Sequence, residues 1–419
     1  MDACIFGLGR IGLPIALVCA EAGYKIVGID INDSLINKLK NRDTIFDEPG
    51  LKSLLIKHLN NNFIPKHQLE DISLDLKQSE YIILAVGTGF AKYPNKPNLS
   101  TLYSVIGQLI ATGIKGKTII LRVTLPIGTC DEVKSFIEKK TGLKEGKDFW
   151  FSFVPERILE GKAIVEEPLL PKIIGAYNDE GFLRVSNFFK KIGGEIVRVS
   201  NPKTAEFIKL IDNSWRNTRF AFANELAFLA EGNDIDVIEA IESANKGYKR
   251  NEIPRPGPVS GYCLGKDPYL LELSFEKISF RRGFNSLWYY GRRANDWLFE
   301  KVAEDIEGST VLIAGISFKA NIDDFRNSHG IEIINRLSKR GCNILIYDPF
   351  LDKNIYTKLP EELAKDLTVY TSFEKALEAH FDTIIIATNH EEFKKEKFRK
   401  IIKGLPENVK IIDLWDIYR

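Results

Sequence analysis

The stretch GLGRIG, residues 7–12, decides the fold of the first part of this 419-residue chain. The apolar run just before it, residues 3–6, is typical of a buried strand, and an apolar helical pattern follows it. Glycines at this spacing allow a tight turn and let the backbone approach a pyrophosphate, whose charge then lies at the helix N-terminus. The stretch therefore predicts a strand–turn–helix unit that binds a dinucleotide.

Asp30 directly follows the next apolar run, residues 26–29. A carboxylate at this position can accept hydrogen bonds from a ribose 2′-OH and repels a 2′-phosphate, which favours NAD over NADP. The order strand, glycines, helix, strand and acid is much more specific than the glycines alone. Cofactor binding is thus favoured, at roughly ten to one, over a glycine-rich turn that binds nothing.

Apolar runs alternate with helical patterns twice along the chain. They occur first at 81–86, 118–123 and 173–174, and again at 310–314, 343–347, 383–387 and 409–413. Between them lie a long helical pattern from Lys203 to about residue 231, a loop rich in Pro and Gly at 246–268, and further helix to Asp305. This organisation predicts an α/β protein with two doubly wound Rossmann-like domains, 1–199 and 306–419, joined by a helical middle domain, 200–305.

The charge balance argues against a nucleic-acid partner, because the net charge is only +1. The basic pairs Arg281-Arg282 and Arg292-Arg293 are interpreted as solvated faces or single-anion contacts. Apolar runs stay below the roughly 18 residues needed to span a bilayer, so no membrane segment is expected. The first residues lead straight into a strand pattern, and we expect no signal peptide.

The five cysteines are scattered and form no CxxC pair, which argues against a disulfide framework and a zinc site and favours a reducing compartment such as the cytoplasm. Cys4, Cys19, Cys130 and Cys342 are expected to be small core residues. Cys263 differs, because Gly, Lys and Asp surround it in GYCLGKDP from Gly261. A thiol beside a lysine in such a loop can attack an aldehyde.

Three other groups of residues are weaker candidates. Lys209 and Asn213 are four residues apart, so a helix places them on one face, where they could stabilise an oxyanion or simply be solvated. Glu156 and Glu160 follow a proline and are potential bases or surface residues. Thr124 comes just after a strand, at the edge where open α/β sheets bind ligands.

Short motifs over almost the whole chain resemble the UDP-glucose/GDP-mannose dehydrogenase family. The matching pieces are GLGRIGLPIA from Gly7, VTLPIGT from Val123, PERILEGKA from Pro155, KLIDNSWR from Lys209, NEL from Asn224, GYCLGKDP from Gly261, RRAND from Arg292, GISFKANIDDFRNS from Gly315 and YDP from Tyr347. Each piece is modest alone, but their joint occurrence in this order is very specific.

The resemblance implies an NAD domain, a helical middle that forms a homodimer, and a C-terminal domain for the nucleotide of a UDP-sugar or GDP-sugar. It also implies a four-electron oxidation that delivers two hydrides to NAD. The C6 alcohol first becomes an aldehyde, which Cys263 attacks to give a thiohemiacetal. This loses a hydride to become a thioester, which water hydrolyses to the acid.

The resemblance further implies roles for matched residues. Lys209 and Asn213 would stabilise the oxyanion, Thr124 and Asp267 would orient a water, and Glu156 or Glu160 would move a proton. Expected cofactor contacts are Gly7, Gly9, Arg10, Ile11, Gly12, Asp30, Thr88, Thr124, Lys266 and Arg326. Expected substrate contacts are Glu156, Arg157, Lys209, Asn213, Arg255, Gly261 and Lys319, and no metal ligand is expected.

Departures from the family pattern leave the sugar open. PER from Pro155 and SGY from Ser260 stand where glucose-oxidising members usually have Pro-Glu-Phe and Gly-Gly-Ser. PRPGP from Pro254 is more like members that act on N-acetylated sugars, whereas Lys266-Asp267 is kept as in the glucose and mannose types. Arg255 is either a substrate contact or a subunit-interface residue.

Two other functions fit parts of the pattern. A single-step β-hydroxyacid or polyol-phosphate dehydrogenase shares the dinucleotide domain and a Lys–Asn pair, but it has no need of Cys263 or a second sheet domain. A non-catalytic NAD-binding regulator would leave many matched reactive residues idle. The twofold oxidation is therefore the main expectation.

Overall fold

The computed structural model describes residues 1–91, 96–275, 285–351 and 367–418, so Arg281 and Arg282 lie outside the described part. The chain divides into two compact units, Met1–Asp212 with Tyr269–Lys277 and Asn213–Pro268 with Ile278–Arg419. The long helix α9 (Pro202–Glu231) contributes to both, and it coincides with the helical pattern predicted there. The predicted borders at 199 and 305 stay predictions.

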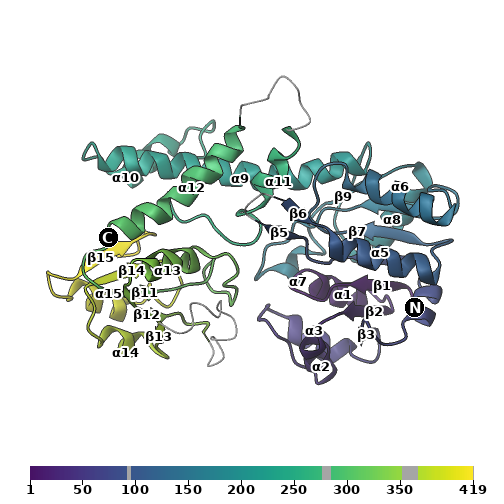
Figure 1. The fold of residues 1–419 in the computed structure, drawn as a ribbon, viewed down its shortest axis with the longest axis horizontal. Coiled ribbons are helices and arrows are strands. Elements are labelled where there is room, and N and C mark those ends of the chain that lie inside the picture. The colour runs from purple at the N-terminus through teal and green to yellow at the C-terminus, as the bar shows by residue number, and fades with distance from the viewer. Residues whose placement is uncertain (92–95, 276–284, 352–366, 419) are drawn as a thin grey trace. The chain divides into compact units, whose positions relative to one another are not determined.

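The first unit is built on an eight-stranded sheet with the order β10-β9-β8-β7-β4-β1-β2-β3, in which only β8 and β9 pair antiparallel (Figure 1). Its strands are β1 (Ala3–Phe6), β2 (Ile26–Asp30), β3 (Phe63–His67), β4 (Tyr81–Leu84), β7 (Thr118–Leu121), β8 (Trp150–Phe153), β9 (Lys172–Ala176) and β10 (Ile196–Val199). A separate antiparallel pair comprises β5 (Gly89–Ala91) and β6 (Lys96–Asn98). The strand order reverses between β1 and β4, which is where doubly wound sheets bind ligands.

Helices cover both faces of this sheet. Ala3 and Ile5 of β1 join one core and Cys4 and Phe6 the other, as the two-residue period of a strand requires. The first core includes residues from α1 (Gly12–Glu21), α2 (Asp33–Lys40), α3 (Leu51–His58), α7 (Ala163–Glu166) and α8 (Asp179–Ile192). The second includes residues from α4 (Ser73–Gln78), α5 (Ser100–Thr112) and α6 (Thr129–Thr141). This layering confirms the predicted doubly wound domain.

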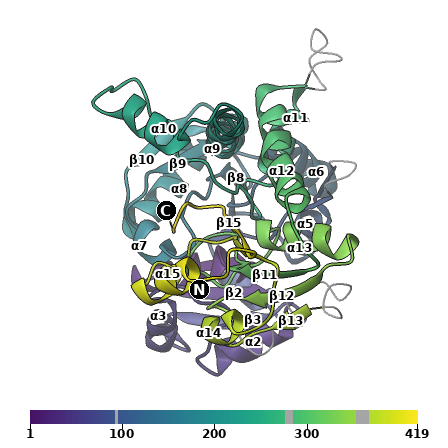
Figure 2. The ribbon, with the colours of Figure 1, turned by 90° about the vertical axis from the view of Figure 1, so that its left-hand side faces the viewer.

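The second unit contains a smaller, wholly parallel sheet with the order β13-β12-β11-β14-β15 (Figures 1 and 2). Its strands are β11 (Thr310–Ala314), β12 (Asn343–Tyr347), β13 (Leu367–Val369), β14 (Thr383–Ile386) and β15 (Lys410–Asp413). One face packs against α12 (Leu287–Glu304) and α13 (His329–Lys339), the other against α14 (Phe373–Leu377) and α15 (Glu396–Lys403). The second Rossmann-like domain is thereby confirmed.

The rest of the second unit is helical, with one long loop. It comprises Asn213–Glu231 of α9, then α10 (Val237–Asn245), and then a loop that ends where α11 (Asp267–Glu272) begins. Among the described residues, no helix is both long and apolar enough to cross a bilayer. The loop before α11 carries Cys263, so this unit holds the candidate nucleophile.

Candidate active site

The glycine turn of the first unit has the geometry that a dinucleotide needs. Gly7 has φ +88°, and a Cβ there would lie 2.7 Å from the carbonyl oxygen of Ala85. A Cβ on Gly12 would overlap the carbonyl oxygen of Gly7 at 1.7 Å, whereas a Cβ on Gly9 would meet nothing within 4 Å. Two glycines are thus required by close packing and Gly9 keeps one side of the turn open, so the turn fits NAD.

Asp30 is tied to this turn through the backbone. Its Oδ2 accepts a hydrogen bond from the amide of Leu8 at 2.7 Å, and its Oδ1 accepts one from the amide of Asn32 at 2.9 Å. The carboxylate is only partly buried. It therefore sits where a ribose hydroxyl can approach it.

Arg10 and Glu160, two sequence candidates from separate motifs, form an ion pair with Nη1 and Oε1 2.5 Å apart. The Arg10 guanidinium also lies 5.1 Å from the centre of the Phe46 ring. Glu160 is thus held beside the glycine turn by a cation. In this arrangement Glu160 is a partner of the cofactor loop as well as a candidate base.

Thr88 and Thr124 are brought together after β4 and β7. The Thr88 hydroxyl donates to the carbonyl oxygen of Thr124 at 2.9 Å. Glu206 of α9 fixes the same segment further along, since its carboxylate accepts the amides of Gly128 at 2.6 Å and Cys130 at 2.7 Å. Glu206 was not predicted, because nothing in the local pattern of α9 indicates that it satisfies the start of α6.

Lys209 and Glu156 form a buried pair in the first unit. The Lys209 ammonium donates to the main-chain carbonyl of Glu156, and its Nζ lies 3.9 Å from the carboxylate oxygen Oε2. Burial raises the pKa of Glu156, although Lys209 and Arg122 oppose the shift. A carboxyl whose pKa is raised by burial is a stronger base than an ordinary glutamate, which suits Glu156 to proton transfer.

A buried ionic cluster lies next to this pair. Arg122 binds Glu167 through both Nη atoms at 2.6 and 3.2 Å, and Lys172 lies 3.2 Å from the same carboxylate. All three side chains are nearly inaccessible to solvent. The charge of Arg122 acts on Glu156, and sequence reasoning missed the Arg122–Glu167 pair because the two residues are 45 positions apart. Arg157, by contrast, is exposed and pairs with Asp212 at 2.9 Å.

Cys263 is the exposed member of the five free cysteines. Cys4, Cys19 and Cys130 are buried, as expected, and Cys342 is partly exposed. Burial raises the pKa of Cys4 to about 11 and that of Cys19 further, so neither is a nucleophile near neutral pH.

The two residues that follow the Cys263 turn are charged and buried. Lys266 Nζ lies 2.6 Å from Oδ1 of Asp267, and the Asn213 side-chain amide donates to Oδ2 at 2.5 Å. Burial would lower the pKa of Lys266, but the charges of Asp267 and Cys263 hold it above its usual value. A permanent ammonium beside a thiol favours the thiolate, which is the reactive form.

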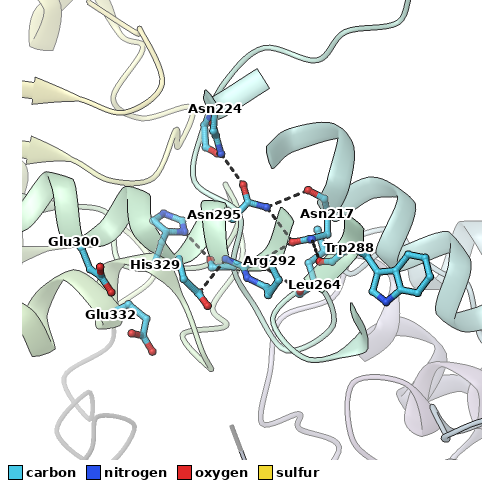
Figure 3. Close-up of polar contacts among 12 residues, drawn as sticks. Asn217, Asn224, Leu264, Trp288, Arg292, Asn295, Glu300, His329 and Glu332 are labelled. Carbon is cyan, nitrogen blue, oxygen red and sulfur yellow. Dashed lines mark hydrogen bonds and ion pairs between the residues drawn. The ribbon is translucent and has the colours of Figure 1, made fainter. Parts of the chain in front are cut away.

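A buried polar cluster anchors the same loop from α9 and α12 (Figure 3). Asn224 exchanges two hydrogen bonds with the backbone of Gly257, at 2.8 and 3.0 Å, and donates to Asn295 at 2.8 Å. Asn295 donates to Asn217, whose side-chain oxygen also accepts from Arg292 at 3.2 Å. The matched pieces NEL and RRAND, which had no assigned role, supply three members of this cluster.

Of the two interpretations of Arg292, the solvated face is wrong, whereas a contact with a single anion agrees with its pairing. Arg292 is 1% exposed, and its Nη2 pairs with Asp296 at 3.1 Å. Its Nη1 is 3.5 Å from the carbonyl oxygen of Leu264, next to Cys263. One helical turn separates Arg292 from Asp296, and this ion pair together with Asn217 compensates the buried charge. Arg293, its neighbour on α12, is exposed.

The remaining candidate residues of the second unit differ in how close they lie to the Cys263 loop. Arg326 binds Asp324 at 2.5 Å and lies 5.4 Å from the ring of Tyr262, so it is near the nucleophile. Gly261 has φ +87°, and a Cβ there would lie 2.5 Å from the Phe318 ring. Lys319 is partly exposed. Arg255 instead pairs with Glu242 of α10 on the surface.

No cluster of His, Cys, Asp or Glu suited to a metal ion occurs in the described ranges, which carry a candidate covalent nucleophile instead. Two sets of residues thus emerge. The first unit holds the glycine turn, Asp30 and the Lys209–Glu156 pair, and the second holds the Cys263 loop. The chemistry available is dinucleotide binding, proton transfer and thiol attack.

Comparisons with known proteins agree with this chemistry. Three domain models of one family match the chain: its NAD binding domain at residues 1–193, its central domain at 203–296 and its UDP binding domain at 312–419. The UDP-N-acetyl-D-mannosamine dehydrogenase of Pyrococcus horikoshii is 32% identical over 99% of this chain and 95% of its own length. That of Campylobacter jejuni is 29% identical over 95% of this chain and 98% of its own.

Solved structures give the same result. The structure of the Pyrococcus horikoshii UDP-D-ManNAc dehydrogenase has a TM-score of 0.84 at 31% identity and covers 100% of this chain and 96% of its own. A Mycobacterium tuberculosis 3-hydroxyisobutyrate dehydrogenase reaches only 0.50 at 14% identity, covering 80% of this chain and 98% of its own, which is a likeness of fold alone. The single-step alternative therefore lacks support. The chain belongs to the UDP-glucose/GDP-mannose dehydrogenase family and is an NAD-dependent nucleotide-sugar dehydrogenase.

Proposed function

We propose that this chain oxidises the C6 alcohol of UDP-N-acetyl-D-mannosamine to the carboxylate, with Cys263 as the covalent nucleophile. The observation that carries the proposal is the exposed thiol on a loop whose next charged residues, Lys266 and Asp267, are buried and paired. The sugar is suggested by relatives of that name across archaea and bacteria. The PRPGP segment from Pro254 also favours an N-acetylated sugar.

Residues of the first unit supply cofactor binding. NAD, when bound, accepts one hydride in each of the two oxidations. The open side of Gly9 and the uncapped start of α1 leave backbone N–H groups for a pyrophosphate. Asp30 orients the ribose through its hydroxyls.

Cys263 lets the second oxidation proceed in two stages, addition of the thiolate to the aldehyde and loss of a hydride from the adduct. Its thiolate adds to the aldehyde carbon and forms a C–S bond, and the carbonyl electrons move to oxygen. Loss of the carbon-bound hydrogen as hydride re-forms the C=O bond and gives the thioester. Water then adds to the thioester carbon, and the C–S bond breaks to release the acid and the thiol.

Other residues stabilise charge and move protons in this proposal. The Lys209 ammonium stabilises the oxyanion, and Glu156, whose pKa is raised by burial, accepts the alcohol proton. Asp267 accepts hydrogen bonds from both Lys266 and Asn213, which fixes these side chains at the end of the loop. Arg157 and Lys319 contact the substrate, for which Arg157 must leave Asp212.

The experiment measures NADH formed from UDP-N-acetylmannosamine, UDP-N-acetylglucosamine, UDP-N-acetylgalactosamine, UDP-glucose and GDP-mannose in parallel. We expect two NADH for each UDP-N-acetylmannosamine consumed. Cys263→Ser should abolish acid formation, whereas the matched variant Cys342→Ser should retain it. A ratio of one NADH per sugar, or acid formation by Cys263→Ser, would refute the covalent route.

We also propose a homodimer that forms through α9 of the second unit. Trp215, Phe222 and Leu229 are spaced seven residues apart, which places them on one face, and they are 62%, 54% and 63% exposed. Tyr290 and Trp297 of α12 are also exposed, and the Trp297 ring packs edge-on against Phe228 at 4.5 Å. Exposed aromatic residues at this density are typical of a protein interface.

Light scattering tests the dimer. The parent chain should have twice the mass of the monomer, and Phe222→Glu with Leu229→Glu should produce monomers. Leu69→Glu, at an 89% exposed position of the first unit, is the control and should leave the mass unchanged. A monomeric parent would contradict the proposal.

A reducing compartment, the cytoplasm, is proposed because the reaction needs a free thiol and the described cysteines form no disulfide. Fractionation of cells of the source organism should recover the activity with cytoplasmic marker enzymes. Recovery with extracytoplasmic markers would contradict this assignment.

A further inference from the structure

The Cys263 loop rests on residues of the C-terminal sheet domain at several points of the second unit. The amide of Gly261 donates to the carbonyl oxygen of Asn327 at 2.8 Å. The Ser260 hydroxyl lies 2.8 Å from Nδ1 of His329. A Cβ on Gly257 would lie 3.1 Å from the Trp415 ring, so the backbone there is close to the indole. The backbone before the nucleophile is therefore closely held.

His329 is the side chain among these contacts whose hydrogen-bond roles can be assigned. It is fully buried at the start of α13, and its Nε2 lies 2.5 Å from the carbonyl oxygen of Ala387 and 3.3 Å from the Thr388 hydroxyl. Burial lowers its pKa to about 4, so the ring is neutral at pH 7. A neutral imidazole carries one N–H, and a carbonyl only accepts, so the proton is on Nε2.

This tautomer fixes the direction of the contact with the loop. Because Nδ1 carries no proton, it accepts, and the Ser260 hydroxyl must donate to it. The Ala387 carbonyl at the other end follows β14 directly, and it also accepts from Trp415 Nε1 at 2.7 Å. A continuous hydrogen-bonded chain therefore runs from the C-terminal edge of the second sheet to Ser260.

We propose that Ser260 and His329 are positioning residues that hold the Cys263 loop against the C-terminal domain. Ser260 stands where glucose-oxidising members of the family usually have Gly, which has no side chain to make this bond. In this chain the serine hydroxyl makes the link to His329. It acts alongside the Asn224–Asn295–Arg292 cluster, which holds the loop from α9 and α12 (Figure 3).

The first measurement is hydrogen–deuterium exchange of the peptide that spans 257–263, made on the full-length chain without substrate at pH 7.5. Ser260→Ala removes the donor, and we expect the Gly261 amide to exchange at least five-fold faster. Ser260→Thr keeps a hydroxyl and should retain the parent exchange rate. Ser338→Ala, on α13 but away from the loop, is the matched control. The melting temperature should change little in all three.

The second measurement rests on the proposed function. Loss of positioning should impair attack by Cys263 more than the first hydride step, so Ser260→Ala should release aldehyde that a hydroxylamine trap detects. We expect its fraction to rise at least three-fold over the parent, and Ser260→Thr to restore the parent value. A purely structural role would lower both steps together and leave the aldehyde fraction unchanged.

Two results would overturn the proposal: unchanged exchange at 257–263 in Ser260→Ala, or faster exchange with an unchanged aldehyde fraction in an active enzyme. If the parent oxidises no UDP-sugar, the proposed function fails, and the exchange data alone decide whether Ser260 holds the loop.

Discussion

Each of the two Rossmann-like sheets has a glycine turn whose following amide binds an aspartate, but the two aspartates have different surroundings. In the first, Gly7 has φ +88° and Asp30 accepts the amide of Leu8 at 2.7 Å. In the second, Gly315 has φ +84° and Asp348 accepts the amide of Ile316, also at 2.7 Å. Each acid ends or directly follows the strand beside the turn. The same strand–glycine–acid arrangement therefore occurs in both domains.

The surroundings of the two acids differ. Asp30 is partly buried, and its hydrogen bonds are with backbone amides. Asp348 is 2% exposed and also accepts from the Ser317 hydroxyl at 3.0 Å and His390 Nε2 at 3.1 Å. Burial would raise the pKa of Asp348, but His390 and the backbone amides of Ile316 and Phe350 hold it below its usual value. An acid that stabilises its own domain in this way is not available to a ribose, whereas Asp30 is.

The largest expected effect tests the structural role of Asp348. Asp348→Ala leaves several buried donors without an acceptor and should lower the free energy of unfolding by about 3–5 kcal/mol. Urea unfolding followed by tryptophan fluorescence measures the change. Asp30→Ala is the matched control and should cost only about 1 kcal/mol. Equal costs for the two variants would remove the distinction between the acids.

A comparable effect is expected from the pH dependence of stability at His329. Its pKa is lowered from 6.5 to about 4 in the folded chain, so between these values the unfolded chain binds more protons. The stabilising contribution is complete above pH 6.5 and is lost as the pH falls towards 4. The pKa difference corresponds to about 3 kcal/mol. Nearby Asp348 and His390 shift the pKa in opposite directions.

The measurement compares the parent chain with His329→Gln, which lacks the titrating ring. Urea midpoints at several pH values should decline more steeply below pH 6.5 in the parent than in the variant. Ser338→Ala retains His329 and should follow the parent curve. Parallel curves for parent and His329→Gln would contradict a lowered pKa.

A smaller effect, on binding, tests the role of Asp30. Asp30→Ala removes the acceptor for the ribose hydroxyls, so the dissociation constant for NAD should rise at least about ten-fold, or about 1.4 kcal/mol. Discrimination against NADP should also weaken, because the repelling carboxylate is gone. Titration of the variant with both cofactors measures this. The control is Asp348→Asn, which should fold and leave the dissociation constant for NAD unchanged. An unchanged dissociation constant in Asp30→Ala would refute the role of Asp30 in binding the ribose.

The sequence predicted the central strands well, for a physical reason. β1, β4, β7, β11, β12 and β14 are buried on both faces, and they appear as apolar runs that local patterns detect. β3, β10 and β13 were missed because they lie at sheet edges and carry polar residues or span three residues. β8 was also missed, although it lies inside the sheet, because its four residues include a serine.

Site residues divide in a similar way. Cys263 and Asp30 have a local signal. Gly, Lys and Asp surround Cys263, and Asp30 directly follows an apolar run at a set position after the glycine turn. Glu206 and Arg122 have none, because their partners Gly128 and Glu167 are distant in the chain. The solvated-face interpretation of Arg292 failed for a related reason. A helical arginine beside another arginine is typical of a solvated face, and only the tertiary structure supplies Asn217, whereas Asp296 lies one turn further along the same helix. Long-range pairing of polar residues is thus what single-sequence patterns leave out.

The smallest expected effect concerns the helices that follow the two turns. α1 begins at Gly12 with Ile11 at its N-cap and no side-chain cap, which leaves N–H groups available to a pyrophosphate. α13 begins at His329, and the Ser328 hydroxyl accepts the amide of Ile331 at 3.1 Å. Ser328→Ala should therefore cost about 1 kcal/mol in unfolding free energy.

The same change is informative about binding. The Ser328 hydroxyl already caps the N-terminus of α13, so this terminus is not expected to bind a pyrophosphate. Ser328→Ala should therefore leave the NAD dissociation constant unchanged while it lowers the urea midpoint. Ser328→Thr retains an acceptor and should recover most of the loss. If Ser328→Ala altered NAD affinity, the second turn would contribute to cofactor binding. The proposal that NAD binds at the first sheet alone would then be wrong.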